Sequence, residues 1–548
     1  MSNHHEESGV KSSLTVLQKL QRQWRHMWNG NPPGFVLLLI GTITGLLMSV
    51  PLVYVIVRSL SAGADSWARL IGGRIPGLLW NTLSLTVAVT VMAVIIGVSL
   101  AWIVIRTDVP GRKVWQWLLA IPLVIPPYVG AVTYIIVFGP SGWMRDIWND
   151  GFLSVFGTYS LNVYSFWGVF FVMTMFTYPY VFLIASASLR KMNRNFEEVA
   201  RSQGMTTSQV FWKVNLPLLR PAIGAGAILI SLYVLSDFGA IAMMRYVTFT
   251  AAIYYQRAGF DIPSAAVLSL VLIVLTVIIL WLEAFSRRRN KFYQTSNTYR
   301  PPEILKLGRW KPFAFLYVVL IFSLAVLMPI YVLVHWTIVG AGAGVIDAGF
   351  FEYALNSVQV SGLAALLCMV LALPLIYLKS RHPSVISSGI DKLSYTGYAL
   401  PGVIVALGMV FVFNNHLPAL YNTFYMIAIA FVVRFLPQAM QAGEASLSLV
   451  SPRMDEAARS LGYPAWKVML KVTLPSILPG ILAGGALVFV SSIKELPATL
   501  MLRPPGFDTL AVRVYYEASE ALYAQAAPGA LLIVLVSILP LHYLLKRY

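Results

Sequence analysis

The chain has 548 residues, of which 58% are hydrophobic and only 11% are charged, and its formal net charge is +18. Soluble proteins usually carry about 25% charged residues, so this composition excludes a soluble fold. Uncharged stretches such as 34–57, 75–105 and 151–189 are long enough to cross a bilayer, which takes roughly 20 apolar residues per helix. The composition therefore predicts an all-α polytopic membrane protein.

The expected elements begin with a basic, mostly polar segment at residues 1–33. Because this segment precedes the first apolar stretch, we expect an uncleaved anchor rather than a signal peptide. Its run KLQRQWRHMW, residues 19–28, suits either an interfacial helix or a solvated tail. The tract HHEE, residues 4–7, resembles a metal-binding sequence, but a disordered tail is the favoured interpretation near a chain end.

We expect twelve membrane spans, six in a first transmembrane half at residues 34–285 and six in a second half at 313–548. A basic linker, residues 286–312, joins the halves. The uncharged stretch 393–433 is too long for one helix, and we expect it to turn at NNHLP, residues 414–418. The spans are about 34–57, 77–105, 114–138, 163–187, 222–243, 262–284, 313–335, 356–378, 393–413, 420–442, 477–502 and 524–545.

The basic residues predict the orientation, because cytoplasmic loops are enriched in Lys and Arg. With the N-terminus in the cytoplasm, thirty of the forty Lys and Arg residues fall in cytoplasmic segments, eight in external loops and two within spans. The opposite orientation inverts this ratio. We therefore expect both termini in the cytoplasm, where the positive surface faces anionic lipid rather than nucleic acid.

The two halves are copies of one another. Residues 197–223 align with residues 455–481 without a gap, at an offset of 258, with twelve identities in twenty-seven positions. Upstream, Asn81/Asn356, Arg106/Arg381 and Pro126/Pro401 match at an offset of 275, so the first half carries a loop 17 residues longer. Six spans per half give both halves the same direction, as in a parallel repeat.

The most similar part of the repeat is a polar phrase after the fourth span of each half, EEVARSQG at 197–204 and DEAARSLG at 455–462. Good helix formers come first, and Gly204 and Gly462 then allow a sharp turn. Pro217 and Pro475 are expected to end the unit before the next span. The phrase predicts a helix–turn–helix at the cytoplasmic surface, repeated because two identical partners bind there.

This repeated pattern resembles the "EAA" loop of permease subunits in binding-protein-dependent ABC importers. The family pattern falls on Glu198, Ala200, Gly204, Glu456, Ala458 and Gly462. The first copy departs from it by having Val199 in place of the first alanine. The resemblance implies a bacterial inner-membrane location, two copies of a cytoplasmic ATP-binding subunit docked on these residues, and a periplasmic binding protein as a third partner.

The chain itself is not expected to be an enzyme. The Gly-x4-Gly-Lys-Ser/Thr phosphate loop is absent, no Gly-Lys dipeptide occurs, and no nucleophile–base arrangement suggests catalysis. We therefore expect the energy to come from a separate ATPase chain, and we expect no cofactor and no resident metal. A secondary transporter also has twelve spans and parallel halves, but the paired loops favour the ABC importer.

Two carboxylates occupy equivalent places inside the fifth span of each half, Asp237 and Glu495. Ionisable groups within spans are candidates for function, so both are candidate pathway residues. The alternative is structural: they pair with Lys494 or cap a helix break at Gly239 or Pro497. Arg434 lies toward the cytoplasmic end of its span, where it is expected to snorkel.

The substrate follows from resemblance alone. Residues 106–140 and 494–528 resemble fused permeases of bacterial ferric-iron importers, which implies transport of Fe³⁺ from a periplasmic binding protein. Fused permeases for thiamine and for aminoethylphosphonate share the architecture and remain alternatives. Ferric iron prefers oxygen ligands, so Tyr254, Tyr255, Tyr515 and Tyr516 are possible contacts, although such tyrosines more often form an interfacial belt.

Overall fold

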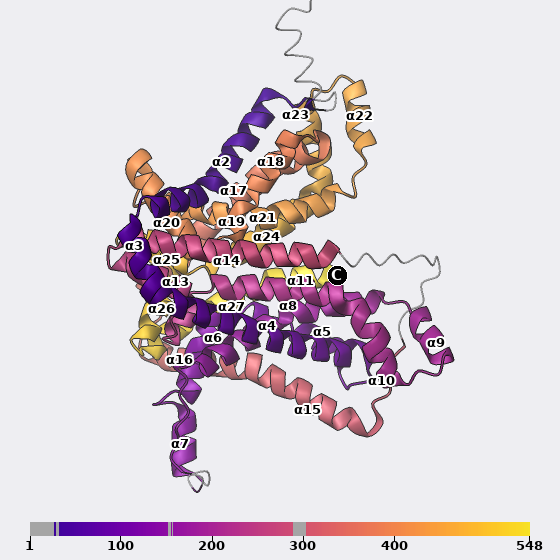
Figure 1. Ribbon diagram of the computed structural model, residues 1–548, viewed down its shortest axis with the longest axis vertical. Coiled ribbons are helices and arrows are strands. Elements are labelled where there is room, and N and C mark those ends of the chain that lie inside the picture. The colour runs from indigo at the N-terminus through magenta and orange to yellow at the C-terminus, as the bar shows by residue number, and fades with distance from the viewer. Residues whose placement is uncertain (1–26, 29–31, 152–154, 156, 289–302, 548) are drawn as a thin grey trace, which may run out of the picture. The chain divides into compact units, whose positions relative to one another are not determined.

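The computed structural model describes residues 27–28, 32–151, 155, 157–288 and 303–547 (Figure 1). The tract HHEE, most of the segment at 19–28 and much of the basic linker lie outside these residues. Unit 1 comprises Met1–Ser49, Leu366–Thr396 and Leu436–Gly485, and unit 2 comprises Val50–Ala365, Gly397–Phe435 and Ala486–Tyr548. These compact units do not follow the two halves of the repeat, so the division into 34–285 and 313–548 stays a prediction.

The described part of the first half is helical. Its α-helices are α2 (Phe35–Leu60), α3 (Ala64–Arg69), α4 (Ile75–Arg106), α5 (Arg112–Leu118), α6 (Pro127–Phe138), α7 (Trp143–Asp150), α8 (Phe166–Lys191), α9 (Asn195–Ser202), α10 (Thr207–Val210), α11 (Leu216–Ser236), α12 (Gly239–Met243), α13 (Phe249–Ala258) and α14 (Ile262–Arg288). Short helical turns are η1 (Leu70–Arg74), η2 (Ile121–Leu123) and η4 (Phe211–Asn215).

The described part of the second half repeats this order. Its α-helices are α15 (Lys311–Phe322), α16 (Met328–Gly342), α17 (Ala348–Arg381), α18 (Val385–Ser394), α19 (Thr396–Ala399), α20 (Gly402–His416), α21 (Phe424–Leu447), α22 (Pro452–Ser460), α23 (Ala465–Val468), α24 (Leu474–Ile493), α25 (Pro497–Leu502), α26 (Leu510–Ser519) and α27 (Tyr523–Arg547). Its short turns are η5 (Gly308–Trp310), η6 (Ser323–Leu327), η7 (Pro418–Leu420) and η8 (Met469–Thr473).

Within the described residues, nine helices are long and apolar enough to cross a membrane. Two bent pairs of helices raise this to eleven if each pair is one span. The twelfth expected span corresponds to α27, whose apolar part is described over the shorter range Tyr523–Ile538. The turn expected at NNHLP is present, because α20 ends at His416 and α21 begins at Phe424.

The third span of each half is broken rather than continuous, which the sequence did not reveal. In the first half the helices on either side of the break meet at 95°, and in the second half the helix is interrupted between Ala399 and Gly402. Each break ends at a proline, Pro126 before α6 and Pro401 before α20, and both prolines have extended backbones with ψ of 136° and 144°. These are the prolines that match between the halves, so the repeat conserves the break itself.

Small residues bring the fourth and fifth spans of each half together. In unit 2, where α4, α8, α11 and α14 run alongside one another (Figure 1), a Cβ added at Gly226 of α11 would lie 2.6 Å from Val181 of α8. In unit 1, a Cβ at Gly484 of α24 would lie 2.8 Å from Ala439 of α21. The two glycines are equivalent in the repeat, and each allows the close backbone approach typical of membrane helices.

Candidate functional site

Each repeated phrase forms a short helix followed by a tight turn, as expected. The helices are α9 and α22, and the glycines after them, Gly204 and Gly462, have φ of +83° and +87°. In both turns a backbone N–H reaches back across the helix end, from Met205 to Ala200 O and from Tyr463 to Ala458 O, each over 3.2 Å. This left-handed ending suits glycine. We call residues 195–217 and 452–475 the candidate docking loops.

The predicted docking residues divide into two groups by exposure. Gly204, Glu456 and Gly462 are exposed, and the Glu198 side chain is 43% exposed while it pairs with Arg194. The alanines Ala200 and Ala458 are buried, at 5% and 8% exposed. The alanines therefore pack each helix against the rest of the chain, and the carboxylates and glycines are the groups that a partner can reach.

Part of the expected boundary of the docking loops was wrong. Pro217 and Pro475 do not end the unit before the next span, because the second helix of each loop continues into that span. One continuous stretch, Thr207–Ser236, is long and apolar enough to span the membrane, and the corresponding stretch in the second half is Trp466–Ile493. A π-helical turn, η4 or η8, lies at the same point in each. Each loop is thus joined to the fifth span by unbroken helix.

A buried ion pair fixes each docking helix to the end of the second span. In unit 2, Arg106 at the last residue of α4 makes two contacts with Glu197, from Nη1 to Oε1 at 2.7 Å and from Nη2 to Oε2 at 2.8 Å. In unit 1, Arg381 Nε lies 2.6 Å from Asp455 Oδ2. All four side chains are less than a tenth exposed. Bidentate arginine–carboxylate pairs are strong and geometrically specific.

Sequence reasoning noticed the two arginines as matched positions but gave them no role. The signal for this pair was present in the sequence. The residue that opens each phrase is acidic, Glu197 in the first half and Asp455 in the second, and an arginine is repeated upstream of each. In unit 1 the carboxylate has a further partner, since Thr473 Oγ1 donates to Asp455 Oδ1 over 3.0 Å. The equivalent first-half residue, Asn215, is also buried.

The first docking loop has a neighbour from the far end of the basic linker. The carboxylate of Glu303 lies 3.4 Å from Arg194 and 3.3 Å from Arg201, which stand at the start and in the last turn of α9. A few residues later, Leu305 N donates to Arg106 O over 2.7 Å. The end of the linker is therefore attached to both the docking helix and the span that holds it.

Asp108 completes this attachment. Its carboxylate accepts a hydrogen bond from Leu307 N over 2.9 Å and pairs with Lys311 Nζ at 3.0 Å. The Leu307 N–H and the Lys311 ammonium both favour the charged form, and they lower the pKa of Asp108 below its ordinary value. The start of the second half is thereby tied to the loop after α4.

The fifth span of each half is broken at its carboxylate. In the first half, α11 ends at Ser236, and Asp237 Oδ1 accepts hydrogen bonds from Ala240 N at 3.0 Å and Ile241 N at 3.3 Å, which caps α12. In the second half, Glu495 Oε1 accepts from Ala498 N at 3.3 Å, at the start of α25. The expected alternative, that these carboxylates cap a break, matches this geometry. Their place on a pathway stays a prediction.

The basic residues at this level have specific partners. The expectation that Arg434 snorkels was wrong. Its Nη1 lies 2.6 Å from Glu495 Oε1, and its side chain is only 17% exposed. Lys494 does not pair with either carboxylate through a hydrogen bond; its ammonium donates to Leu123 O over 3.1 Å. Two carboxylates and two cations therefore share this level of unit 2. The formal charges of these four side chains sum to zero.

Comparison with known proteins identifies this arrangement. The family model described as "Binding-protein-dependent transport system inner membrane component" matches residues 93–292 and again residues 364–546. The chain belongs to this family. Both matches include a docking loop and a broken fifth span, so each half of this inner-membrane permease carries one copy of the family's domain.

Relatives of the permease cover either the whole chain or one half of it. The Fe(3+)-transport system permease protein FbpB 2 of Haemophilus influenzae is 34% identical over 525 residues, which cover 94% of this chain and 99% of the relative. The ferric transport system permease protein FbpB of Actinobacillus pleuropneumoniae is 24% identical over 508 residues, covering 87% of this chain and 72% of the relative. The sulfate transport system permease protein CysW of Synechocystis sp. is 24% identical over 256 residues, covering 45% of this chain and 89% of the relative.

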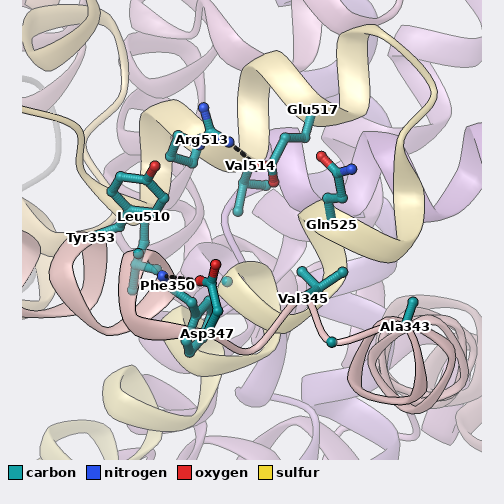
Figure 2. A pocket seen from close by; sticks show the side chains of 13 residues that line it. Ala343, Val345, Asp347, Phe350, Tyr353, Leu510, Arg513, Val514, Glu517 and Gln525 are labelled. Atoms are coloured by element: carbon teal, nitrogen blue, oxygen red, sulfur yellow. Dashed lines mark hydrogen bonds and ion pairs between the residues drawn. The ribbon is translucent and has the colours of Figure 1, made fainter. Parts of the chain in front are cut away.

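Figure 2 shows a cavity of about 270 Å³ in unit 2 of the permease, between the start of α17 and the helices α26 and α27. Its charged side chains already have partners. Arg513 Nη2 lies 2.7 Å from Glu517 Oε1, and Asp347 accepts a hydrogen bond from Phe350 N over 2.9 Å. A charged substrate would have to break these pairs, so we assign none to this cavity.

Proposed function

We propose that this permease is the membrane-spanning subunit of an ATP-driven importer that moves ferric iron, delivered by a periplasmic binding protein, into the cytoplasm. The observation that carries the proposal is the pair of candidate docking loops, each with the same helix, glycine turn and buried ion pair. Two equivalent docking loops imply two copies of the same partner. The partner we infer is a separate ATP-binding subunit, because the chain has no phosphate-binding loop of its own.

Ferric iron is the proposed substrate because the relatives that match most of this chain, at 34% and 24% identity, carry ferric transport in their names. The sulfate permeases match one half and at lower coverage. Thiamine and aminoethylphosphonate remain alternative substrates of the same architecture, and a secondary transporter is the alternative mechanism. We propose the orientation with both termini in the cytoplasm, which places the docking loops and residues 286–312 on that side.

Reconstitution tests the proposal. Vesicles that contain the permease, its co-expressed ATP-binding subunit and external binding protein loaded with Fe³⁺ should accumulate iron only when ATP is inside. Uptake driven by a proton or sodium gradient without ATP would support the secondary transporter instead. Sulfate, thiamine and aminoethylphosphonate, each supplied with the same complex, are the comparison substrates.

The number of ATP-binding subunits bound per permease chain tests the role of the two docking loops separately. The purified permease should hydrolyse no ATP alone, and co-expression should recover two ATP-binding subunits per chain. A ratio of one in a complex that transports at the full rate would contradict that role, whatever the substrate.

A further inference from the structure

Four tyrosines from the two halves come together in unit 2. Tyr254 and Tyr255 lie on α13, and Tyr515 and Tyr516 lie on α26. Both helices have ten residues, both follow a threonine N-cap with an extended backbone, and the tyrosines occupy the same positions in each. The tyrosine pair is therefore part of the repeat, and the fold places its two copies side by side.

The two halves meet at this tyrosine cluster. The rings of Tyr254, from the first half, and Tyr515, from the second half, both pack against the ring of Phe238. On each helix the adjacent rings are edge-on, with centroids 5.8 and 5.9 Å apart. Residues of a lipid-facing aromatic belt spread around a protein at the membrane surface. Tyr254 and Tyr515 instead pack on one shared ring, that of Phe238.

The cluster adjoins the break in the fifth spans. The ring of Phe238, the residue after Asp237, lies 4.7 Å from Tyr254 and 5.9 Å from Tyr515. Its equivalent in the second half is Leu496, and both are 1% exposed. A Cβ added at Gly239 would lie 3.1 Å from Leu496, so the two breaks face each other here. The tyrosines thus stand beside two buried apolar side chains, Phe238 and Leu496, one from each half.

One tyrosine on each of the two helices is accessible. Tyr255 and Tyr516 are 42% and 36% exposed, whereas Tyr254 and Tyr515 are less so. The guanidinium carbon of Arg503 lies 5.2 Å from the centre of the Tyr516 ring. Arg503 also pairs with Asp508, which balances its charge. The hydroxyl groups of Tyr255 and Tyr516 therefore belong to accessible side chains that can offer oxygen ligands.

We propose that Tyr254, Tyr255, Tyr515 and Tyr516 form a transit site for a hard trivalent cation, taken from the binding protein before it passes Phe238 and Leu496. The inference rests on the proposed function for the identity of the cation. Phenolate oxygen is a preferred ligand of Fe³⁺. Each phenol that binds exchanges its proton for the metal and releases that proton to water, and the reverse exchange frees the cation.

The carboxylates of the described residues do not themselves form a cation site. Within the described residues, no three His, Cys, Asp or Glu side chains are grouped so that they hold a metal ion. At the level of Asp237 and Glu495, two cations accompany the two carboxylates, as described above. The four phenols, in two matched pairs, are an oxygen-rich cluster that the repeat builds next to Phe238 and Leu496.

The test uses a variant that removes the four hydroxyl groups and keeps the rings: Tyr254→Phe, Tyr255→Phe, Tyr515→Phe and Tyr516→Phe together. Purified permease is titrated with ferric nitrilotriacetate, and the visible phenolate-to-iron charge-transfer absorption is recorded. The control variant carries Tyr331→Phe and Tyr425→Phe, two exposed tyrosines outside the cluster. We expect the band in the wild type and in the control, and its loss in the fourfold variant.

Uptake into vesicles is the second readout. The fourfold variant should lose at least tenfold in iron uptake while the complex assembles and hydrolyses ATP as the wild type does. A fourfold variant with the wild-type band, or with wild-type iron uptake, overturns the transit site and leaves the proposed function intact. A wild-type complex that takes up another substrate and no iron overturns the proposed function itself.

Discussion

Arg106 and Glu197 form an ion pair that is almost completely buried, with the two side chains 0% and 3% exposed. The pair joins the last residue of a membrane helix to the first turn of a candidate docking helix. Arg381 and Asp455 do the same in the other half. Each candidate docking helix is therefore held to the second span by an ion pair, in addition to the fifth span that continues from the loop.

Loss of one partner of this pair should destabilise the permease. Glu197→Gln leaves the Arg106 guanidinium buried without a counter-charge, a change that costs about 3–5 kcal/mol in buried pairs. We expect a clearly lower thermal unfolding midpoint in detergent. The matched control is Glu198→Gln, one residue further along α9, where the half-exposed pair with Arg194 is worth about 1 kcal/mol or less.

Removing both charges separates stability from coupling. The double variant Arg106→Met with Glu197→Leu should recover most of the unfolding midpoint, since apolar pairs often replace buried ion pairs without loss. We expect it to assemble with the ATP-binding subunit yet transport less per ATP hydrolysed. Wild-type transport per ATP in this double variant would show that the pair only stabilises the fold.

A large residue at either glycine turn should still allow the permease to fold but should block binding of the ATP-binding subunit. A Cβ at Gly204 or Gly462 meets nothing within 4 Å, so Gly204→Arg with Gly462→Arg costs about 1–2 kcal/mol per site for the left-handed backbone without a clash. We expect the double variant to fold and to lose binding of the ATP-binding subunit, measured by co-purification.

Gly63 supplies the control for this experiment. It lies between α2 and α3, has φ of +78°, and is equally open. Gly63→Arg carries the same backbone strain and added charge away from the docking loops. Equal loss of the partner in both variants would mean that strain, rather than the docking surface, explains the result.

Asp108 should make the attachment of the linker depend on pH. Its pKa is lowered in the folded chain, so its contribution to stability is present above the unfolded value of about 3.9 and is lost as the pH falls through the folded pKa. Limited proteolysis near residues 303–311 should therefore increase toward low pH. In Asp108→Asn the segment should be cut readily at every pH; unchanged protection would contradict the role.

The two central carboxylates should respond differently to neutralisation. Asp237→Asn keeps an oxygen that caps α12, so folding should survive, and iron uptake should fall if Asp237 lines the pathway. Glu495→Gln removes the counter-charge of Arg434 and should reduce the yield of intact complex. Adding Arg434→Met to Glu495→Gln should restore that yield. Full uptake by Asp237→Asn with Glu495→Gln would eliminate a pathway role for both.

The sequence predicted the features that repeat or that depend on hydropathy. The glycine turns at Gly204 and Gly462 followed from one phrase written twice, and the family followed from the same phrase. Hydropathy does not register a bend, so the breaks at Pro126 and Pro401 were visible only as matched prolines. The sequence could not predict that Arg434 pairs with Glu495, because Glu495 lies 61 positions away in the sequence and outside the helix of Arg434.

The charges around the central break show what a fused chain allows. Asp237 and Glu495 are equivalent, but Arg434 corresponds to Phe176 and Lys494 to Ser236, so both cations belong to the second half. A dimer of two first halves would bring together two carboxylates and no cation. A dimer of two second halves would bring four cations against two carboxylates. Pairing one half with its unlike copy gives equal numbers of each, and gene fusion makes this pairing obligatory, so the fused chain has a charge balance that no symmetric assembly of either half can have.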